Sequence, residues 1–189
     1  MASIKEKIAY ALGDAAAGGI VWKVMSIAFP LFFTNVFGLS FADAAVLMLV
    51  ARMFDVVTDP LMGSLADRTQ SRFGTYRPWL IFGAIPFGLI FALLLYTPDF
   101  GPVGKRIYAY TLYLLMMAVY TMVNVPYGSL LGVMTDDDNE TNQFSSFRMV
   151  GAYAMGFITL LSFPYLQKMV GGTDAHQYAV IGAVLGVVA

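Results

Sequence analysis

The sequence predicts an all-α integral membrane protein built as a bundle of six helices. Its 189 residues are 59% hydrophobic and only 12% charged, and the mean hydropathy is +0.71, whereas a soluble domain has about 25% charged residues. Apolar stretches recur along the chain, and about 20 such residues cross a hydrocarbon core of about 30 Å. The connectors between these stretches are short, which places consecutive helices antiparallel.

The first expected span covers residues 8–36. Its charged leader resembles the start of a secretory signal, but the apolar part is too long for one and contains Asp14, so we expect a permanent span. The turn-forming segment Gly38–Ala42 separates it from a second span over residues 41–66.

The third and fourth spans are expected over residues 77–96 and 107–134, with the turn formers of Pro98–Lys105 between them. The acidic run Asp136–Asp138 follows the fourth span. It lacks the glycine and the distant glutamate of a calcium loop. We therefore interpret this run as a solvated connector.

The fifth span is expected over residues 144–170, with Asp138 or Asn139 as the cap of its helix. The connector Gly171–His176 leads to a sixth span over residues 178–189, which is still apolar where the chain stops. We therefore expect a fragment, a single N-terminal transmembrane bundle whose C-terminal bundle is missing. Six spans would allow a 3+3 inverted repeat.

Basic residues predict the orientation, because cytoplasmic connectors carry an excess of lysine and arginine. One side of the expected topology holds Lys5, Lys7, Arg68, Arg72, Arg77 and Arg148, and the other holds Lys105, Arg106 and Lys168. This distribution predicts a multi-pass plasma-membrane protein with a cytoplasmic N-terminus.

The composition also excludes several classes of function. The net charge is −1, so there is no basic field for nucleic acid. The sequence has no cysteine and one histidine, His176, which excludes thiolate zinc sites and argues against histidine metal sites and Ser/His triads. No phosphate-binding or dinucleotide motif occurs. We expect neither an enzyme nor a bound cofactor.

Five ionisable residues lie deep in the expected spans, more than four residues from either end of a span: Asp14, Lys23, Arg52, Asp55 and Asp59. Burying such a group costs at least about 2.5–3.5 kcal/mol, and it normally faces the bundle interior and serves a function.

Arg52, Asp55 and Asp59 share one helix and lie within about 60° of one another around its axis. Two close carboxylates repel each other in a poorly solvated site, and a bound cation or a shared proton would relieve this repulsion. Arg52 is expected to pair structurally with Asp55. One arginine cannot neutralise two acids, so we expect Asp59 to have a function. Pro60 lacks an amide donor, which could free a carbonyl oxygen as a cation ligand.

The other two embedded charges, Asp14 and Lys23, lie in the first expected span. Asp14 and Lys23 are nine residues apart, about half a turn out of phase in an α-helix, so they are not expected to pair. Lys23 could reach an acid on another helix, such as Asp55, or line the cavity. Trp22 could stack on a sugar ring, although packing is the simpler expectation.

A polar face is expected on the fourth span. Tyr120, Thr121, Asn124 and Gly128 fall on one side of a helix. Their hydroxyl and amide groups could contact a sugar, although ordinary hydrogen bonds between membrane helices would use the same residues.

Several segments together resemble a known family. Residues 55–79 read DVVTDPLMGSLADRTQSRFGTYRPW and look like the glycoside–pentoside–hexuronide:cation symporters, the melibiose-permease branch of the major facilitator superfamily. The segment 124–130 followed by Arg148 is similar to the family's fourth and fifth helices, and Gly13-Asp14 with residues 32–35 and 38–40 is similar to its first. The resemblance implies the N-terminal six-helix bundle of a twelve-helix carrier.

The resemblance also implies roles for individual residues. The cation site would be Asp55, Asp59 and Thr121. The sugar site would be Asp14, Tyr120, Asn124 and Arg148. The inside-facing conformational loop would include Gly63, Asp67, Arg68 and Arg72.

Three departures from melibiose permeases bear on the ligands. This chain has Asn124 where they carry Asp, Gly128 where they carry Trp, and Thr58 where they carry Asn. The first two leave the sugar open among glycosides, pentosides and hexuronides, and the third leaves Na+ and H+ both open.

We therefore expect a sugar:cation symporter that works by alternating access. Its partners would be a small sugar, the lipid bilayer and the missing C-terminal half, without nucleic acid. A major-facilitator carrier of a non-sugar solute, or a membrane protein that does not transport, is the alternative.

Overall fold

The computed structural model describes residues 3–188, which form helices joined by short connectors and contain no strand in this range. The first helix is built from consecutive pieces, which we call helix 1 together. These are α1 (Ile4–Asp14), η1 (Ala15–Val21), η2 (Val24–Ala28), α2 (Phe29–Leu31) and η3 (Phe32–Val36). The others are α3 (Phe41–Asp67), α4 (Arg77–Leu94), α5 (Pro102–Met134), α6 (Asp138–Val170) and α7 (Asp174–Val188).

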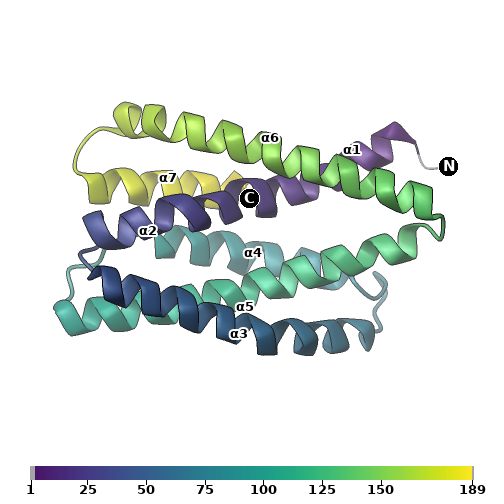
Figure 1. The fold of residues 1–189 in the computed structure, drawn as a ribbon, viewed down its shortest axis with the longest axis horizontal. Coiled ribbons are helices and arrows are strands. Elements are labelled where there is room, and N and C mark those ends of the chain that lie inside the picture. The colour runs from purple at the N-terminus through teal and green to yellow at the C-terminus, as the bar shows by residue number, and fades with distance from the viewer. Residues whose placement is uncertain (1–2, 189) are drawn as a thin grey trace.

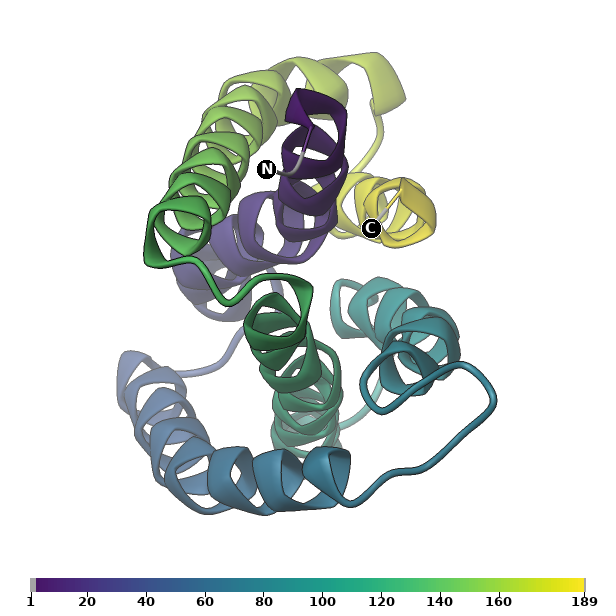
Figure 2. The ribbon, with the colours of Figure 1, turned by 90° about the vertical axis from the view of Figure 1, so that its right-hand side faces the viewer.

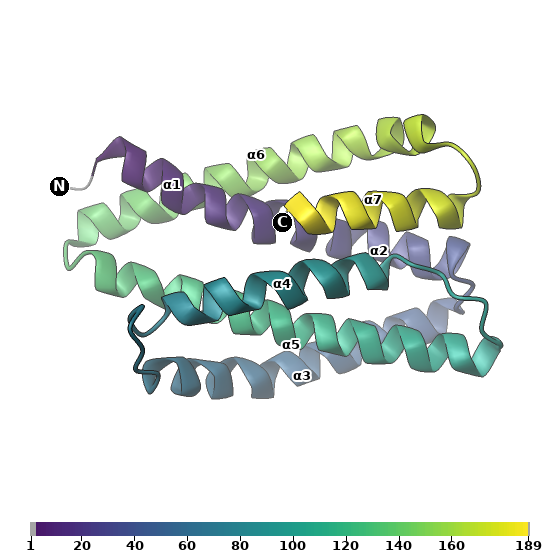
Figure 3. The same cartoon turned by 180° about the vertical axis from the view of Figure 1, so that it is seen from behind.

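The helices run roughly along one direction (Figure 1). The N-terminal end of α1 and the connectors 68–76 and 135–137 lie at one end of the bundle, and the connectors 37–40, 95–101 and 171–173 lie at the other (Figures 1 and 3). This arrangement gathers the basic connector after α3 and the start of α1 at the same end.

Seen end-on, the helices form two layers (Figure 2). Helix 1 packs against α6 and contacts α7 in one layer, while α5 packs against both α3 and α4 in the other. Contacts between α4 and α7 join the layers on one side, and α3 and α6 flank the opposite side. These two sides differ in chemistry, because α4 and α7 have no charged residue after their first turns whereas α3 and α6 do.

Several helices begin earlier than the expected spans because their first turns contain polar residues. α1 begins with a capping box formed by Ser3 and Glu6, and α5 begins at Pro102, a residue suited to a first helical turn. The cap of α6 is Asp137, whose side chain accepts a hydrogen bond from the Asn139 amide. The expectation of Asp138 or Asn139 as the cap is therefore wrong by one or two residues.

Helix 1 contains three π-helical segments. The amides of Trp22, Phe29 and Phe37 bond to carbonyl groups five residues earlier rather than four. This widening changes the angular spacing of side chains. A calculation that assumes α-helical geometry therefore misplaces residues of helix 1 relative to one another.

The bundle has an aromatic core and an apolar exterior. Phe29, Phe32 and Phe33 of helix 1 are fully buried, as is Phe37 directly after it. Many large apolar side chains of α3, α4 and α6 are exposed, as in a protein solvated by lipid. Four described helices are long and apolar enough to cross a membrane: helix 1, α4, α5 and α6. α3, with 27 residues, is also long enough, but its middle carries three charged residues.

Candidate functional site

Three charged residues in the middle of α3, Arg52, Asp55 and Asp59, lie near α5. Arg52 and Asp55 form an ion pair of 3.5 Å, in which the Asp55 side chain is 19% exposed. One turn further along, Asp59 accepts a hydrogen bond of 2.8 Å from the Thr121 hydroxyl group of α5. The two aspartates are close enough to interact electrostatically. The structure thus brings Asp55, Asp59 and Thr121 together, as the family resemblance implies.

The three residues of this cluster differ in exposure. Thr121 is only 4% exposed, Asp55 is half-buried, and Asp59 is exposed. Asp59 therefore lies at the edge of the α3–α5 interface, with one side toward protein and the other open. Such a carboxylate can exchange a ligand without unpacking the core.

Arg52 connects the acids to an aromatic stack between the layers. Its guanidinium lies 4.9 Å from the centre of the Trp22 ring, and Trp22 stacks on Tyr120 with ring centres 5.0 Å apart. Tyr120 also contacts Phe87. Arg52 thus contacts both Asp55 of the cation-site candidates and the aromatic face that holds Tyr120.

A second charged pair lies between helix 1 and α6. Arg148 Nε is 3.5 Å from Asp14 Oδ2, and both side chains are largely buried, at 34% and 13% exposure. Within residues 3–188, Arg148 Nε has this ion pair but no hydrogen bond. This N–H group is therefore a buried donor to which a ligand oxygen could form a hydrogen bond.

Two tyrosines, Tyr10 of helix 1 and Tyr127 of α5, lie beside this ion pair. The Tyr10 and Tyr127 rings stack at 4.6 Å, and each hydroxyl group donates to the backbone carbonyl of the other residue. Gly13 makes this stack possible, because a Cβ there would lie 2.9 Å from the Tyr127 ring. The pair ties helix 1 to α5.

The expected polar face of the fourth span is only partly correct. Tyr120 faces Trp22, whereas Thr121 faces Asp59 on α3. Asn124 lines a cavity of about 200 Å³ between helix 1, α4 and α5. Gly128 is exposed, with open space around it. The four residues therefore do not share one partner: Tyr120 faces helix 1 and Thr121 faces α3.

Lys23 and Asp14 both face α6, contrary to the half-turn separation calculated for an α-helix. The Lys23 ammonium lies 4.7 Å from the centre of the Tyr153 ring, and Asp14 pairs with Arg148 of the same helix. The π-helical segment between them accounts for the error. The suggested pairing of Lys23 with Asp55 does not occur, because Asp55 pairs with Arg52.

The connector after α3 has its own hydrogen bonds. Asp67 accepts a bond of 2.8 Å from the Tyr76 hydroxyl group, which raises the pKa of the Tyr76 phenol. Among the described residues, Asp67 forms no ion pair with Arg68 or Arg72, and Arg72 lies over the Phe73 ring. Gly63 lies earlier on α3, where a Cβ would meet Val125 of α5 at 3.8 Å.

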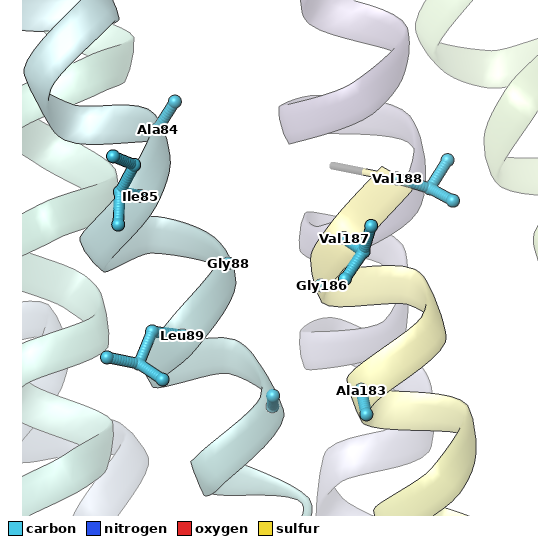
Figure 4. A pocket seen from close by; sticks show the side chains of 9 residues that line it. Ala84, Ile85, Gly88, Leu89, Ala183, Gly186, Val187 and Val188 are labelled. Atoms are coloured by element: carbon cyan, nitrogen blue, oxygen red, sulfur yellow. The ribbon is translucent and has the colours of Figure 1, made fainter.

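An apolar groove of about 600 Å³ lies away from all of these charges, between α4 and α7 (Figure 4). It lies where Gly88 and Gly186 let the two backbones approach closely. Its lining contains no ionisable side chain. In residues 3–188, no three His, Asp or Glu side chains gather as metal ligands.

Sequence reasoning missed two features of the site. The Tyr10–Tyr127 stack joins residues 117 positions apart, and the Arg52–Trp22–Tyr120 stack joins three helices. The aromatic residues on helix 1 were the available signal, but a sequence does not show which ring each one meets.

Comparison with known proteins places this arrangement in a family. A family model described as "MFS/sugar transport protein" matches residues 9–189. The chain is 43% identical to the inner membrane symporter YicJ of Escherichia coli K12, with 91% of the chain and 37% of that protein aligned.

More distant relatives have names that mention a sugar. The chain is 30% identical to the isoprimeverose transporter of Lactiplantibacillus pentosus, over 97% of the chain and 39% of that protein. It is 31% identical to the glucuronide carrier protein homolog of Escherichia coli K12, over 81% and 33%. The chain thus spans 40% or less of the length of these relatives, which are transporters. It belongs to the MFS/sugar transport protein family, as a multi-pass membrane protein of the glycoside–pentoside–hexuronide:cation symporter branch.

Proposed function

We propose that this chain forms the N-terminal half of a sugar:cation symporter of the plasma membrane, with its N-terminus in the cytoplasm. Transport by alternating access, rather than a chemical reaction, is the proposed activity, and it requires a C-terminal bundle as partner. Relatives named for isoprimeverose and glucuronide support a sugar as the solute.

The coupling cation is proposed to bind at Asp55, Asp59 and Thr121. The observation that carries this proposal is the 2.8 Å bond from Thr121 to Asp59, with Asp55 one turn away on α3. Carboxylate and hydroxyl oxygens are hard ligands suited to a small cation. Pro60 donates no hydrogen bond, so the carbonyl of Val56 lacks its usual helical donor and could add a ligand. Protonation of one acid would serve H+ coupling at the same place.

The sugar is proposed to bind at Asp14, Arg148, Tyr120 and Asn124. Asp14 and Arg148 supply an acceptor and a donor side by side, which suits adjacent sugar hydroxyl groups. Arg148 Nε lacks a hydrogen-bond acceptor in the described protein, and a sugar oxygen would provide one. Tyr120 presents a ring in the same interior region.

The two sites are proposed to be coupled through Arg52. A cation bound to Asp55 would compete with Arg52 for the Asp55 carboxylate and would weaken the ion pair of 3.5 Å between them. Arg52 would then interact more strongly with Trp22, which stacks on Tyr120. Cation binding would thereby order the sugar face, and linkage requires that the sugar tighten cation binding by the same factor.

The connector after α3 is proposed to act in the conformational change. Asp67, Arg68 and Arg72 lie at or beyond the end of α3, and Gly63 lies shortly before it. The two halves of a carrier would separate and meet here as they rock. The Asp67–Tyr76 bond would hold this connector in a defined shape.

Uptake into proteoliposomes tests the proposal. The carrier that contains this chain and its C-terminal half is reconstituted, and labelled glycosides, pentosides and hexuronides are offered under an inward Na+ or H+ gradient. We expect one gradient to drive accumulation of at least one sugar. Accumulation of non-sugar solutes only, or sugar entry that ignores both gradients, would contradict the proposal.

A further inference from the structure

Two cavities meet at the end of the bundle opposite the N-terminus, where α5 begins (Figure 3). The first, which we call the basic cavity, has a volume of about 250 Å³ and is lined by the connector 37–40, the start of α3 and the first turn of α5 with Lys105 and Arg106. The second, which we call the α5 groove, has a volume of about 430 Å³ and runs along α5. Phe100 lines both, so the two cavities adjoin at its side chain.

The basic cavity carries an excess positive charge. Asp43 pairs with Arg106 at 3.1 Å, and the Arg106 side chain is still 56% exposed. Lys105 has no ion-pair partner among residues 3–188. Its ammonium lies 5.7 Å from the centre of the Phe37 ring and donates only a long bond of 3.5 Å to the Phe37 carbonyl oxygen. Asp99 is exposed and does not line the cavity. One acid and two bases therefore give the lining a net charge of +1.

Basic residues are scarce at this end of the molecule. Lysine and arginine are normally in excess on the cytoplasmic side, and on the proposed topology only Lys105, Arg106 and Lys168 lie on the opposite side. Two of these three line the same cavity. Because the connectors at the end of a bundle lie at the depth of the lipid headgroups, this pair is placed where the phosphate group of a lipid would be.

The α5 groove leads from the basic residues into the depth of the membrane. From Gly104 to Leu112 it covers about 12 Å along the helix axis, and the hydrocarbon of one leaflet is about 15 Å deep. Ile107, which lines it, is 62% exposed. The residues of α5 that line the groove recur at helical spacing and share one face of the helix: Gly104, Ile107, Tyr108, Thr111 and Leu112. The groove thus has the length and lining that suit an acyl chain.

The wall between the two cavities is fixed by aromatic contacts within the protein. The Phe100 ring meets the Tyr108 ring edge-on, with centres 6.0 Å apart. Tyr108 also stacks on Phe37 at 6.1 Å and donates a hydrogen bond of 2.7 Å to the Leu93 carbonyl group. A Cβ on Gly104 would lie 3.0 Å from Phe100 Cβ, so this glycine lets Phe100 approach α5. The groove therefore exists before a ligand binds.

We propose that the basic cavity and the α5 groove together bind one anionic phospholipid, with its phosphate at Lys105 and Arg106 and one acyl chain along α5. Phosphate oxygens accept charge-assisted hydrogen bonds from ammonium and guanidinium groups, and an anionic headgroup neutralises the charge of the lining. Asp43 holds Arg106 and is not a ligand, because a carboxylate repels a phosphate. A free phosphate would fill the basic cavity alone, whereas a lipid fills both. The inference does not depend on which solute is carried.

Lipid binding to the complete carrier tests the proposal. The carrier is purified in detergent and titrated with phosphatidylglycerol, with phosphatidylcholine of the same acyl chains, or with glycerol phosphate. Native mass spectrometry counts the bound molecules, and the melting temperature is recorded at each concentration. Lys105→Gln removes a charge and Lys105→Arg keeps it. Lys105 is changed rather than Arg106, because loss of Arg106 would leave Asp43 without its partner.

A second variant and two controls separate the headgroup from the acyl chain. Ile107→Ser places a polar group in the α5 groove, where the side chain is exposed and bears little on packing. Val133→Ser is its control, because Val133 is exposed near the other end of α5. Lys168→Gln is the control for Lys105→Gln, because Lys168 is exposed in the last turn of α6, at the same end of the bundle.

We expect phosphatidylglycerol to bind more tightly than phosphatidylcholine and to raise the melting temperature more, while glycerol phosphate does neither. Lys105→Gln should weaken phosphatidylglycerol binding about fivefold, and Lys105→Arg should retain it. Ile107→Ser should weaken the binding of both lipids, and the two controls should match wild type.

Equal affinity for the two lipids, or equal effects of Lys105→Gln and Lys168→Gln, would overturn the inference. Tight binding of glycerol phosphate would show a site for free anions and would overturn it as well. Absence of lipid binding would show that another part of the carrier covers both cavities, with the same consequence. None of these outcomes bears on sugar:cation symport, which the uptake assay tests separately.

Discussion

Thr121 Oγ1 donates a hydrogen bond of 2.8 Å to Asp59 Oδ1 across the interface between α5 and α3. The buried hydroxyl group fixes one carboxylate oxygen of an otherwise exposed aspartate. Among the described residues, the second oxygen has no hydrogen-bond or ion-pair partner. The carboxylate is thus oriented by protein on one side and available to a cation on the other.

Removal of this hydroxyl group should weaken cation binding. Thr121→Val keeps the shape of the side chain but frees the carboxylate, and a hydrogen bond to a charged group contributes about 1.5–3 kcal/mol. We expect the cation concentration for half-maximal sugar uptake to rise about tenfold, and Thr121→Ser to remain near wild type. Thr159→Val is the control, because Thr159 is equally buried but bonds to Met155 of its own helix. Equal effects of Thr121→Val and Thr159→Val would contradict this role.

Neutralisation of the Asp14–Arg148 pair should abolish tight sugar binding. Asp14→Asn or Arg148→Gln removes a sugar ligand and leaves a largely buried charge without its partner. We expect each variant to lose about tenfold or more in sugar affinity and to accumulate less in the membrane. The double variant should recover in abundance, because no charge is stranded, but not in affinity. Recovery of affinity in the double variant would show that the pair is structural only.

Trp22 should affect coupling more than cation binding. Trp22→Leu removes both the contact with Arg52 and the stack with Tyr120, each worth about 0.5–1.5 kcal/mol. We expect KM for the sugar to rise about two- to tenfold and the stimulation by cation to shrink. Trp22→Tyr should retain most of both. Isothermal titration with sugar, at saturating and at zero cation, measures the effect, and an unchanged ratio of the two affinities would contradict it.

Sequence reasoning succeeded where the helix is regular. α3 is α-helical throughout, so the spacing of Arg52, Asp55 and Asp59 placed them on one face, and the expected Arg52–Asp55 pair is present. The resemblance to a family added Thr121, which the spacing alone left as one of several polar residues. Its bond to Asp59 joins residues 62 positions apart, a distance that no local pattern spans.

The positions of Asp14 and Lys23 were predicted wrongly because helix 1 is irregular between them. The π-helical segment between Asp14 and Lys23 turns both side chains toward α6, and nothing in the sequence around Gly18 and Gly19 specifies such a segment on its own. Close packing against α6 accompanies it, because a Cβ on Gly19 would lie 2.9 Å from the carbonyl oxygen of Ala152. The partners of Asp14 and Lys23 are set by this tertiary contact.

The glycine under Lys23 should be sensitive to substitution. Gly156→Val would place a side chain against the Lys23 stem, and overpacking of this kind costs about 1–3 kcal/mol. We expect a lower melting temperature in detergent. Gly132→Val is the control, because a Cβ there meets nothing within 4 Å, and it should melt near wild type. Identical melting of the two variants would contradict tight packing between helix 1 and α6.

The most direct measurement is the cation dependence of sugar uptake in Asp59→Asn, made in the complete carrier. Asp43→Asn is the matched control, because Asp43 is on the same helix but pairs with Arg106 at the opposite end. If Asp59 binds the coupling cation, Asp59→Asn will still bind sugar but lose its stimulation by Na+ or H+, while Asp43→Asn keeps it. Undiminished cation stimulation in Asp59→Asn would contradict the cation site.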